Sequence, residues 1–412
     1  MSHTPNKIAG QYNGEKGGFF MLTCITTALT IVTLGIYRFW AKSRVRRYVW
    51  SATAPNNDPM EYTGTGIEKF IGFLIAMVFL AIYLGLTQLG LSFVGLSLMD
   101  ISATDPDNFD VDPIQFVGPI ATFVFIIPLV LFARYRGRRY MLSRTRWRGL
   151  RFGMDQGAIG FALRGMLYGL LTLLSLGLLW PLMTFKLEKY MTDRTWYGDA
   201  QFEQEGSWTE LYRSFVHLLL GVLALIILPA ISAVTDSWAI LVLYPFVFIY
   251  AAVGLVFYRV DSFRRMARNK VVDDAMTFEA TPETGFVVKT YVLGSLLTSL
   301  ILFLASLPIG LVTVGLAMSG NIGPEGFDPA TIMDSSGVAF AGIALTVFVY
   351  FGLILLSNAC FNAFILQPIY GHFVEKGTLI NAKHLDAIEQ RAGDKMPDAE
   401  GFADALDVGG AF

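Results

Sequence analysis

Apolar residues in this 412-residue chain gather into long runs that carry almost no charge. A helix needs roughly 20 apolar residues to cross a hydrocarbon core of about 30 Å, and each run approaches or exceeds that length. The runs cover 18–40, 70–99, 114–133, 157–183, 212–235, 238–258, 285–317 and 338–366. This pattern predicts a mainly α-helical, polytopic membrane protein rather than a large soluble protein with buried helices.

Short segments between these runs alternate apolar and polar residues around turn residues, which is typical of β-hairpins. The four segments are RYVWSATA-PNND-PMEYTGTG, RTRWRG-LRFG, RTWYGDAQFEQEG and NKVVDDAMTFEA. An isolated hairpin is barely stable in water, so we expect these hairpins to pair into a small cytoplasmic sheet. Glu61, Glu203 and Glu279 occupy one repeated position in the pattern. Pairing with a neighbouring Arg or Lys is a better interpretation of these carboxylates than a functional role.

Lys and Arg are distributed unevenly between the apolar runs. The segments that contain acidic residues and no base are 100–113, 234–237 and 318–337. The bases concentrate in 41–69, 134–156, 184–211, 259–284 and the C-terminal tail. Because basic short loops stay on the cytoplasmic side of a membrane, we expect the acidic segments outside. The basic segments and both termini are expected in the cytoplasm.

Strict alternation of eight spans cannot produce this arrangement, because either orientation of the N-terminus leaves a strongly basic segment outside. The conflict disappears if the runs at 18–40 and 157–183 enter and leave on the cytoplasmic face. These runs break at Leu34-Gly35 and at Leu176-Gly177 before a charged exit. The sequence therefore predicts about six transmembrane helices plus two re-entrant or half-inserted segments. Two ordinary helices with interfacial ends are the alternative.

Parts of the sequence repeat. Aligned without gaps at an offset of 142, residues 29–70 match 171–212, and a second offset of 126 places Arg138-Arg139 over Arg264-Arg265. Internal repeats are a common building device of transporters. We expect a first membrane repeat over 1–156, a second over 157–284, a partial third over 285–375, and an acidic cytoplasmic tail over 376–412.

Two stretches carry a resemblance to a known family. They are LGIYRFWAKSRVRRY at 34–48 and EYTGTG at 61–66. Together with the surrounding residues 1–75, and more weakly through most of the chain, they resemble the uncharacterised bacterial inner-membrane family typified by YjgN. The chain differs from the family pattern in two places. Its tail after 375 is rich in acidic residues, and no basic segment follows the apolar run at 285–317. The resemblance implies a multi-pass inner-membrane protein and transfers no catalytic residue.

Composition and motifs argue against an enzyme. The chain is 54% hydrophobic and 16% charged, whereas charged residues approach about a quarter of a soluble domain. Cys24 and Cys360 lie inside apolar runs, and no catalytic, nucleotide-binding or zinc-binding motif occurs. The four histidines are dispersed as His3, His217, His372 and His384. We expect no enzymatic activity, no cofactor, no metal site and no disulfide.

Polar groups inside apolar runs are costly and often functional. The candidates for an intramembrane polar site are Arg164, His217, Asn358 and Asn362. Arg164 either faces protein or water, or extends back to the interface. An interfacial role suits His217 better than a proton relay. The two asparagines share one helix face, where hydrogen bonding between helices is favoured over a solute contact.

Arginines next to the apolar runs are candidates for contacts with anionic lipid headgroups. They are Arg44, Arg46, Arg47, Arg138, Arg139, Arg264 and Arg265. Because these clusters abut predicted spans, lipid is a simpler partner than nucleic acid. The function we expect first is that of a transporter or permease-like protein for a small solute. The alternative is a membrane scaffold or lipid-binding adaptor that docks protein partners through its hairpins.

Overall fold

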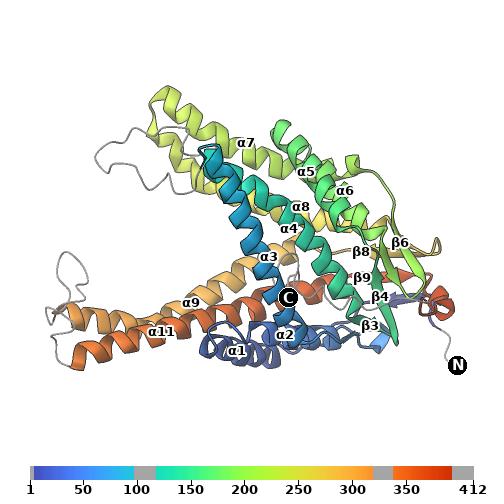
Figure 1. Ribbon diagram of the computed structural model, residues 1–412, viewed down its shortest axis with the longest axis horizontal. Coiled ribbons are helices and arrows are strands. Elements are labelled where there is room, and N and C mark those ends of the chain that lie inside the picture. The colour runs from blue at the N-terminus through green and yellow to red at the C-terminus, as the bar shows by residue number, and fades with distance from the viewer. Residues whose placement is uncertain (1–3, 97–116, 319–336, 392–412) are drawn as a thin grey trace.

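The computed structural model describes residues 4–96, 117–318 and 337–391, shown in Figure 1. The described chain is mainly helical, and six of its helices are long and apolar enough to cross a membrane. Their bounds are α3 (Gly66–Phe93), α4 (Val117–Ser143), α7 (Tyr212–Thr235), α8 (Tyr244–Arg268), α9 (Thr284–Met318) and α11 (Gly337–Phe361). The predicted mainly helical, polytopic class is supported, and the candidate spanning helices equal the predicted six in number. The acidic segments 100–113 and 319–336 lie outside the described residues.

The strands form one antiparallel sheet in the order β1-β9-β8-β7-β6-β5-β4-β3-β2. Their bounds are β1 (Lys7–Ala9), β2 (Glu61–Tyr62), β3 (Thr145–Trp147), β4 (Leu150–Met154), β5 (Thr195–Tyr197), β6 (Ala200–Gln204), β7 (Lys270–Val272), β8 (Met276–Ala280) and β9 (Gly377–Ile380). The sheet curves into a half-barrel. Segment 52–54 links its two edges, because Ala54 N–H donates to the Gln11 carbonyl (2.9 Å) and Met60 N–H donates to the Thr53 carbonyl (2.9 Å).

The sheet is larger than the sequence predicts. Three of the four predicted hairpins are present, as β3–β4, β5–β6 and β7–β8. The first is wrong, since its leading half continues helix α2 to Ala52 and only Glu61–Tyr62 forms a strand. The edge strand β1 and its neighbour β9 are also additions. Neither forms a hairpin with a strand next to it in the sequence, because β9 pairs with β1 and, across the helices α9 and α11, with β8.

Helical pairs connect neighbouring strands of this sheet. The pairs α3–α4, α7–α8 and α9–α11 lie between β2 and β3, β6 and β7, and β8 and β9, the last pair followed by α12 (Gln367–Glu375). Since those strands are paired or share one sheet, each helical pair returns to the end from which it left. The sheet therefore lies at one end of the six long helices, as Figure 1 shows on its right-hand side.

Two shorter helical hairpins also begin and end at the sheet. They are α1 (Lys16–Val32) with α2 (Arg38–Ala52), and α5 (Ala158–Leu174) with α6 (Trp180–Thr192). The Tyr48 hydroxyl near the end of α2 donates to the Glu15 carbonyl just before α1, at 2.8 Å. The Tyr190 hydroxyl near the end of α6 donates to the Gly157 carbonyl just before α5, at 3.1 Å. Each apolar run thus returns to its starting point.

Both hairpins turn at the Leu-Gly pair noted in the sequence. Leu34 and Leu176 have φ angles of 50° and 53°, and Gly35 and Gly177 have 92° and 87°. In each turn the glycine N–H donates to a threonine carbonyl five residues earlier, at 2.7 and 2.8 Å. The leucine side chains are 93% and 91% exposed. The same backbone turn therefore presents an apolar tip in both hairpins.

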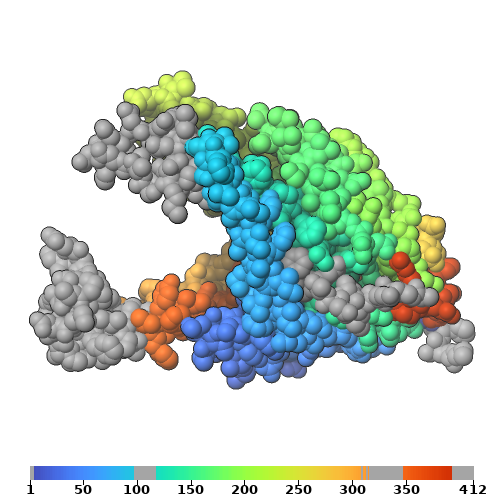
Figure 2. Space-filling model, viewed as in Figure 1, coloured from blue at the N-terminus to red at the C-terminus, as the bar shows by residue number. Residues whose placement is uncertain are grey.

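The inner face of the sheet holds the largest core of the described chain. Its buried members include Ile8, Trp147, Tyr197, Val272 and Met276, one or more from most of the strands. Side chains alternate between the two faces of a strand, so the intervening polar residues point outward. On the membrane side, Figure 2 shows a wide notch between the arm of α9 and α11 and the blue helix α3.

Candidate functional site

A groove with several polar side chains lies between α9 and α11. Both helices are long and apolar enough to span a membrane. Ser295, Ser299, Leu302 and Ser306 follow one another at helical spacing along α9 and line it, and Ser357 lines it from α11. The groove has a volume of about 900 Å³. With a rise of about 1.5 Å per residue, Ser295 lies about 16 Å along α9 from its sheet end. The groove therefore lies within the apolar length of α9.

Several polar groups in the groove have unused hydrogen-bonding capacity. The Thr298 hydroxyl is buried and has no hydrogen-bond partner in the described chain. Asn358 uses its side-chain oxygen to accept from Thr27 of α1 (3.2 Å) and from Asn362 (3.0 Å). Its amide N–H groups find no acceptor among the described residues. A buried polar group without a partner costs about 1–3 kcal/mol, so the Thr298 hydroxyl favours a ligand that would satisfy it. Asn358 is exposed and offers its amide N–H groups to the same ligand.

The backbone at one end of the groove is irregular. Residues Asn362–Leu366 form a π-helical turn between α11 and α12, and such turns occur frequently at functional sites. Gly294 allows close packing here, because a Cβ at this position would lie 2.6 Å from the Ile365 side chain and 3.0 Å from the Phe364 carbonyl oxygen. The turn brings Asn358 and Asn362 beside α9 and α1.

The chemistry of the groove is that of neutral hydrogen bonding. Its lining consists of hydroxyl, amide, aromatic and aliphatic side chains, with no charged residue. Elsewhere in the described chain, no group of three His, Cys, Asp or Glu side chains could hold a metal ion. The groove can recognise a small uncharged solute through several hydrogen bonds. It offers no nucleophile paired with a base.

The other predicted intramembrane residues lie away from this groove. The Arg164 guanidinium donates to the Gly160 carbonyl one turn earlier (3.1 Å) and lies 4.6 Å from the centre of the Tyr190 ring on α6. It therefore points toward the sheet end of its hairpin. His217 on α7 has its Nδ1 3.0 Å from the Tyr250 hydroxyl on α8. The four candidates thus belong to three separate places.

The arginines predicted to contact lipid headgroups have partners within the protein. Arg46 is 1% exposed and lies 3.3 Å from the Tyr62 hydroxyl. Arg44 donates to the Tyr37 hydroxyl, Arg47 to the Gly64 carbonyl, and Arg139 to the Met154 carbonyl. Arg264 and Arg265 both bind Asp261, at 2.6 and 2.8 Å. In this structure Arg46 and Arg139 hold helices to the sheet, whereas Arg264 and Arg265 pair within α8 and Arg265 also bonds to Ser214 on α7.

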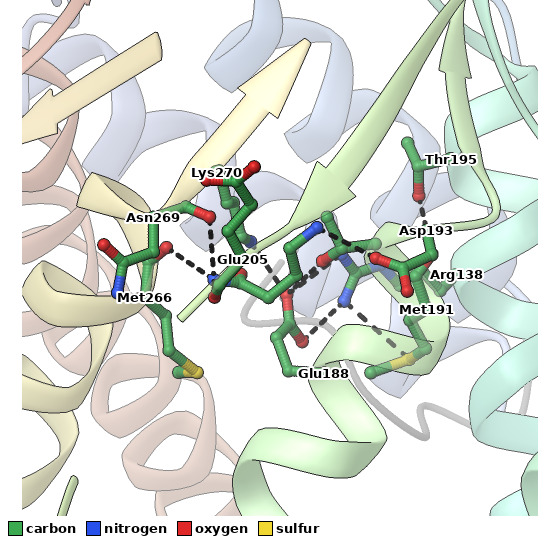
Figure 3. A network of polar contacts seen from close by, with 11 residues as sticks. Arg138, Glu188, Met191, Asp193, Thr195, Glu205, Met266, Asn269 and Lys270 are labelled. Atoms are coloured by element: carbon green, nitrogen blue, oxygen red, sulfur yellow. Dashed lines mark hydrogen bonds and ion pairs between the residues drawn. The ribbon is translucent and has the colours of Figure 1, made fainter. Parts of the chain in front are cut away.

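A charged cluster that the sequence did not reveal joins α4, α6 and β7 (Figure 3). The Glu188 carboxylate accepts two hydrogen bonds from Arg138, at 2.9 and 3.2 Å, and one from Lys270, at 3.0 Å. Burial raises the pKa of Glu188, but the two cations outweigh it and hold this pKa well below its ordinary value. The sequence shows only that Glu188 is an acidic residue between Lys186 and Lys189. That pattern does not indicate its partners Arg138 and Lys270.

The repeated carboxylates Glu61, Glu203 and Glu279 are exposed on β2, β6 and β8. Glu61 lies opposite Arg146 in the register of β2 and β3, which fits the predicted pairing with a base. Glu203 and Glu279 lie opposite Val271 and Thr378. The residue before each of these glutamates is apolar. These residues, Met60, Phe202 and Phe278, face the inner side of the sheet and pack on its core.

The described fold and groove define a polytopic helical membrane protein with one extramembrane sheet. The family model of a bacterial protein of unknown function, DUF898, matches residues 7–319, and the chain belongs to this family. Inner membrane protein YjgN of Salmonella typhimurium is 27% identical over 144 residues, which are 35% of this chain and 30% of that protein. YjgN of Escherichia coli K12 is 25% identical over 151 residues, or 36% and 32%. No solved structure matches the chain.

Proposed function

We propose that this protein binds a small uncharged polar solute in the groove between α9 and α11 and transfers it across the membrane. The observation that supports transport is the row of hydroxyl and amide groups along a groove of about 900 Å³ in two apolar spans. Polar groups at membrane depth are costly and commonly mark a solute pathway. The absence of charge from the groove lining favours a neutral solute with several hydrogen-bonding groups.

The membrane and the orientation belong to the same proposal. The names of the relatives favour the bacterial inner membrane. The basic segments 134–156, 184–211 and 259–284 all include strands of the sheet, and bases favour the cytoplasmic side. We therefore place the sheet in the cytoplasm. The two short hairpins would then enter the membrane from that side and return, with Leu34 and Leu176 at their tips.

Transport is favoured over protein docking by the form of the sheet. The alternative docking surface consists of the cytoplasmic hairpins, which are expected to pair into a sheet. In that sheet the large apolar residues pack on a shared inner core rather than on the outer face that a partner would contact. The α9–α11 groove, in contrast, retains the buried Thr298 hydroxyl, which the described protein leaves without a partner.

A ligand screen tests the proposal. The purified full-length protein is heated with a panel of neutral polar solutes, such as polyols, sugars and small amides, and its unfolding temperature is recorded. We expect at least one solute to raise that temperature. Thr298→Val should weaken the effect, since a lost hydrogen bond of about 0.5–1.5 kcal/mol raises Kd about two- to ten-fold. Uptake of the solute into proteoliposomes should fall in parallel.

Thr87→Val is the matched control. Thr87 lies on the spanning helix α3, outside the groove, and its hydroxyl bonds to the Tyr83 carbonyl of its own helix. This variant should keep the response of the wild type. If no solute in the panel stabilises the protein, or if both variants respond alike, the groove is not a solute site.

A further inference from the structure

A second cavity, separate from the α9–α11 groove, lies against the inner face of the sheet. Its volume is about 390 Å³, within the range of about 300–1,000 Å³ that is usual for small-molecule sites. Its walls come from strands far apart in the sequence, including Trp147, Phe202, Val272, Phe278 and Leu379. No residue that lines it is charged.

The Tyr197 hydroxyl, a polar group in the cavity wall, already has a hydrogen-bond partner and carries no charge. The Tyr197 hydroxyl donates to the Trp147 carbonyl at 3.0 Å. Burial raises the pKa of Tyr197 to about 12, with Arg148 opposing the shift, so the phenol stays neutral near pH 7. Water in a cavity needs 2–4 polar partners, and this lining does not supply them. The cavity is suited to an apolar guest.

The alternation of the strands explains why the cavity is apolar. Met60, Phe202 and Phe278 each precede one of the repeated carboxylates and line the cavity. Because successive side chains point to opposite faces, the carboxylates Glu203 and Glu279 are directed away from it. The residue before each repeated carboxylate therefore places a large apolar side chain on the cavity wall.

The cavity continues toward the membrane helices. A neighbouring cavity of about 310 Å³ shares Phe152, Phe202, Phe278 and Phe373 with the first. This neighbour is also lined by residues of α4 and α8 and by three charged residues, Arg138, Lys270 and Glu279. These two cations are the ones that bind Glu188 in Figure 3. The two cavities thus follow one another from the helix ends into the sheet.

We propose that the paired cavities bind a single linear hydrocarbon chain that enters from the membrane end of the sheet. An apolar cavity in series with a second one that carries charged groups, with four phenylalanines shared between them, suits a flexible chain with a polar end better than a compact molecule. The spanning helices α4 and α8 bring the entrance to the edge of the bilayer, where such chains are abundant. The chain belongs either to a free fatty acid or to a membrane phospholipid.

Photo-crosslinking of the full-length protein in lipid nanodiscs tests this site. Nanodiscs avoid detergent, whose hydrocarbon chains would compete with the labelled lipid for the cavity. One sample contains a fatty acid with a diazirine at mid-chain, and another contains a phospholipid with the same labelled chain. After irradiation, the modified peptides are identified by mass spectrometry. We expect crosslinks on the inner-face residues of β6 to β9, and the sample that gives them identifies the source of the chain.

Two variants on β9 provide a matched comparison. Leu379 faces the cavity and Ile380 faces the other side of the sheet, and both are partly buried. Leu379→Trp should fill the cavity and lower sheet crosslinking about ten-fold or more, a change that corresponds to about 1.4 kcal/mol of binding free energy. Ile380→Trp should leave crosslinking unchanged.

If Leu379→Trp does not fold, the positions of the crosslinked peptides in the wild-type protein decide whether the proposal holds. Crosslinks restricted to the spanning helices in both samples would overturn the proposal. Equal sheet labelling in the wild type and a folded Leu379→Trp variant would also overturn it. Because Leu379 is not part of the α9–α11 groove, solute binding there should be unchanged, so failure here is distinguishable from failure of the transport proposal.

Discussion

At the scale of single residues, pairing across the chain changes the meaning of several side chains. Arg138 is a headgroup candidate when only its neighbours in sequence are considered, yet it binds Glu188 with two hydrogen bonds. Arg46 lies beside a predicted span but is buried against Tyr62. Each partner lies on another element, so sequence spacing did not identify it.

Removal of Arg138 should destabilise the junction of α4, α6 and β7. Arg138→Met leaves Glu188 with Lys270 as its cation, and we expect a loss of about 1.5–3 kcal/mol, the usual range for hydrogen bonds to charged groups. Thermal unfolding of Arg138→Met, Glu188→Gln and the double variant measures the coupling. Additive losses would show that the two side chains do not stabilise each other.

The same carboxylate predicts a dependence of stability on pH. The pKa of Glu188 is lower in the folded protein than in the unfolded chain, so its contribution is fully present above the unfolded value of about 4.3 and is lost as the pH falls below it. Unfolding temperatures measured from pH 7 to pH 3 should fall more for the wild type than for Glu188→Gln. Parallel curves would contradict this contribution.

At the scale of elements, the two Leu-Gly hairpins show a local sequence signal that the structure realises as a defined turn. Gly177 has a φ of 87°, and a Cβ there would meet no atom within 4 Å. Glycine is therefore favoured at position 177 by the backbone conformation and not by a lack of space for a side chain. Gly169, in the helical part of α5, is equally open around its Cβ position but has no unusual φ.

Alanine substitutions at these two glycines should act in opposite directions. Gly177→Ala should lower the free energy of unfolding by about 1–2 kcal/mol, because a Cβ disfavours positive φ. Gly169→Ala should raise it by about 0.5–1 kcal/mol, since alanine is the better helix former. Chemical denaturation of the two variants beside the wild type measures both changes. A stabilising Gly177→Ala would mean that the turn is not maintained.

At the scale of the whole molecule, every helical pair departs from one sheet and returns to it. This arrangement groups 41–69, 134–156, 184–211 and 259–284 at the same end, as the distribution of bases predicts. The side of the membrane on which that end lies remains a prediction from charge. Of the acidic segments expected on the opposite side, 234–237 lies between α7 and α8 at the end away from the sheet, whereas 100–113 and all but the ends of 318–337 fall outside the described residues.

Cysteine labelling in intact cells tests the orientation and the half-inserted hairpins together. Single cysteines are placed at Ser2, Asn57, Asp105 and Asp199 in a background without Cys24 and Cys360. We expect an impermeant thiol reagent to label only the cysteine at Asp105. Labelling at Ser2 without Asn57 would mean that the first run crosses the membrane, and labelling at Asp199 would mean the same for 157–183.

The sequence by itself determined the membrane class, the six spans, three hairpins and the position of both Leu-Gly breaks. These features depend on local composition and on periods of a few residues, which are visible in a single stretch. Only the tertiary structure decided the nine-stranded sheet, because β1 and β9 pair with strands that lie far from them in the chain. It also decided the Glu188 cluster, the α9–α11 groove and the apolar cavity. Each of these is formed by side chains far apart in the chain, and their contacts depend on how the helices return to the sheet.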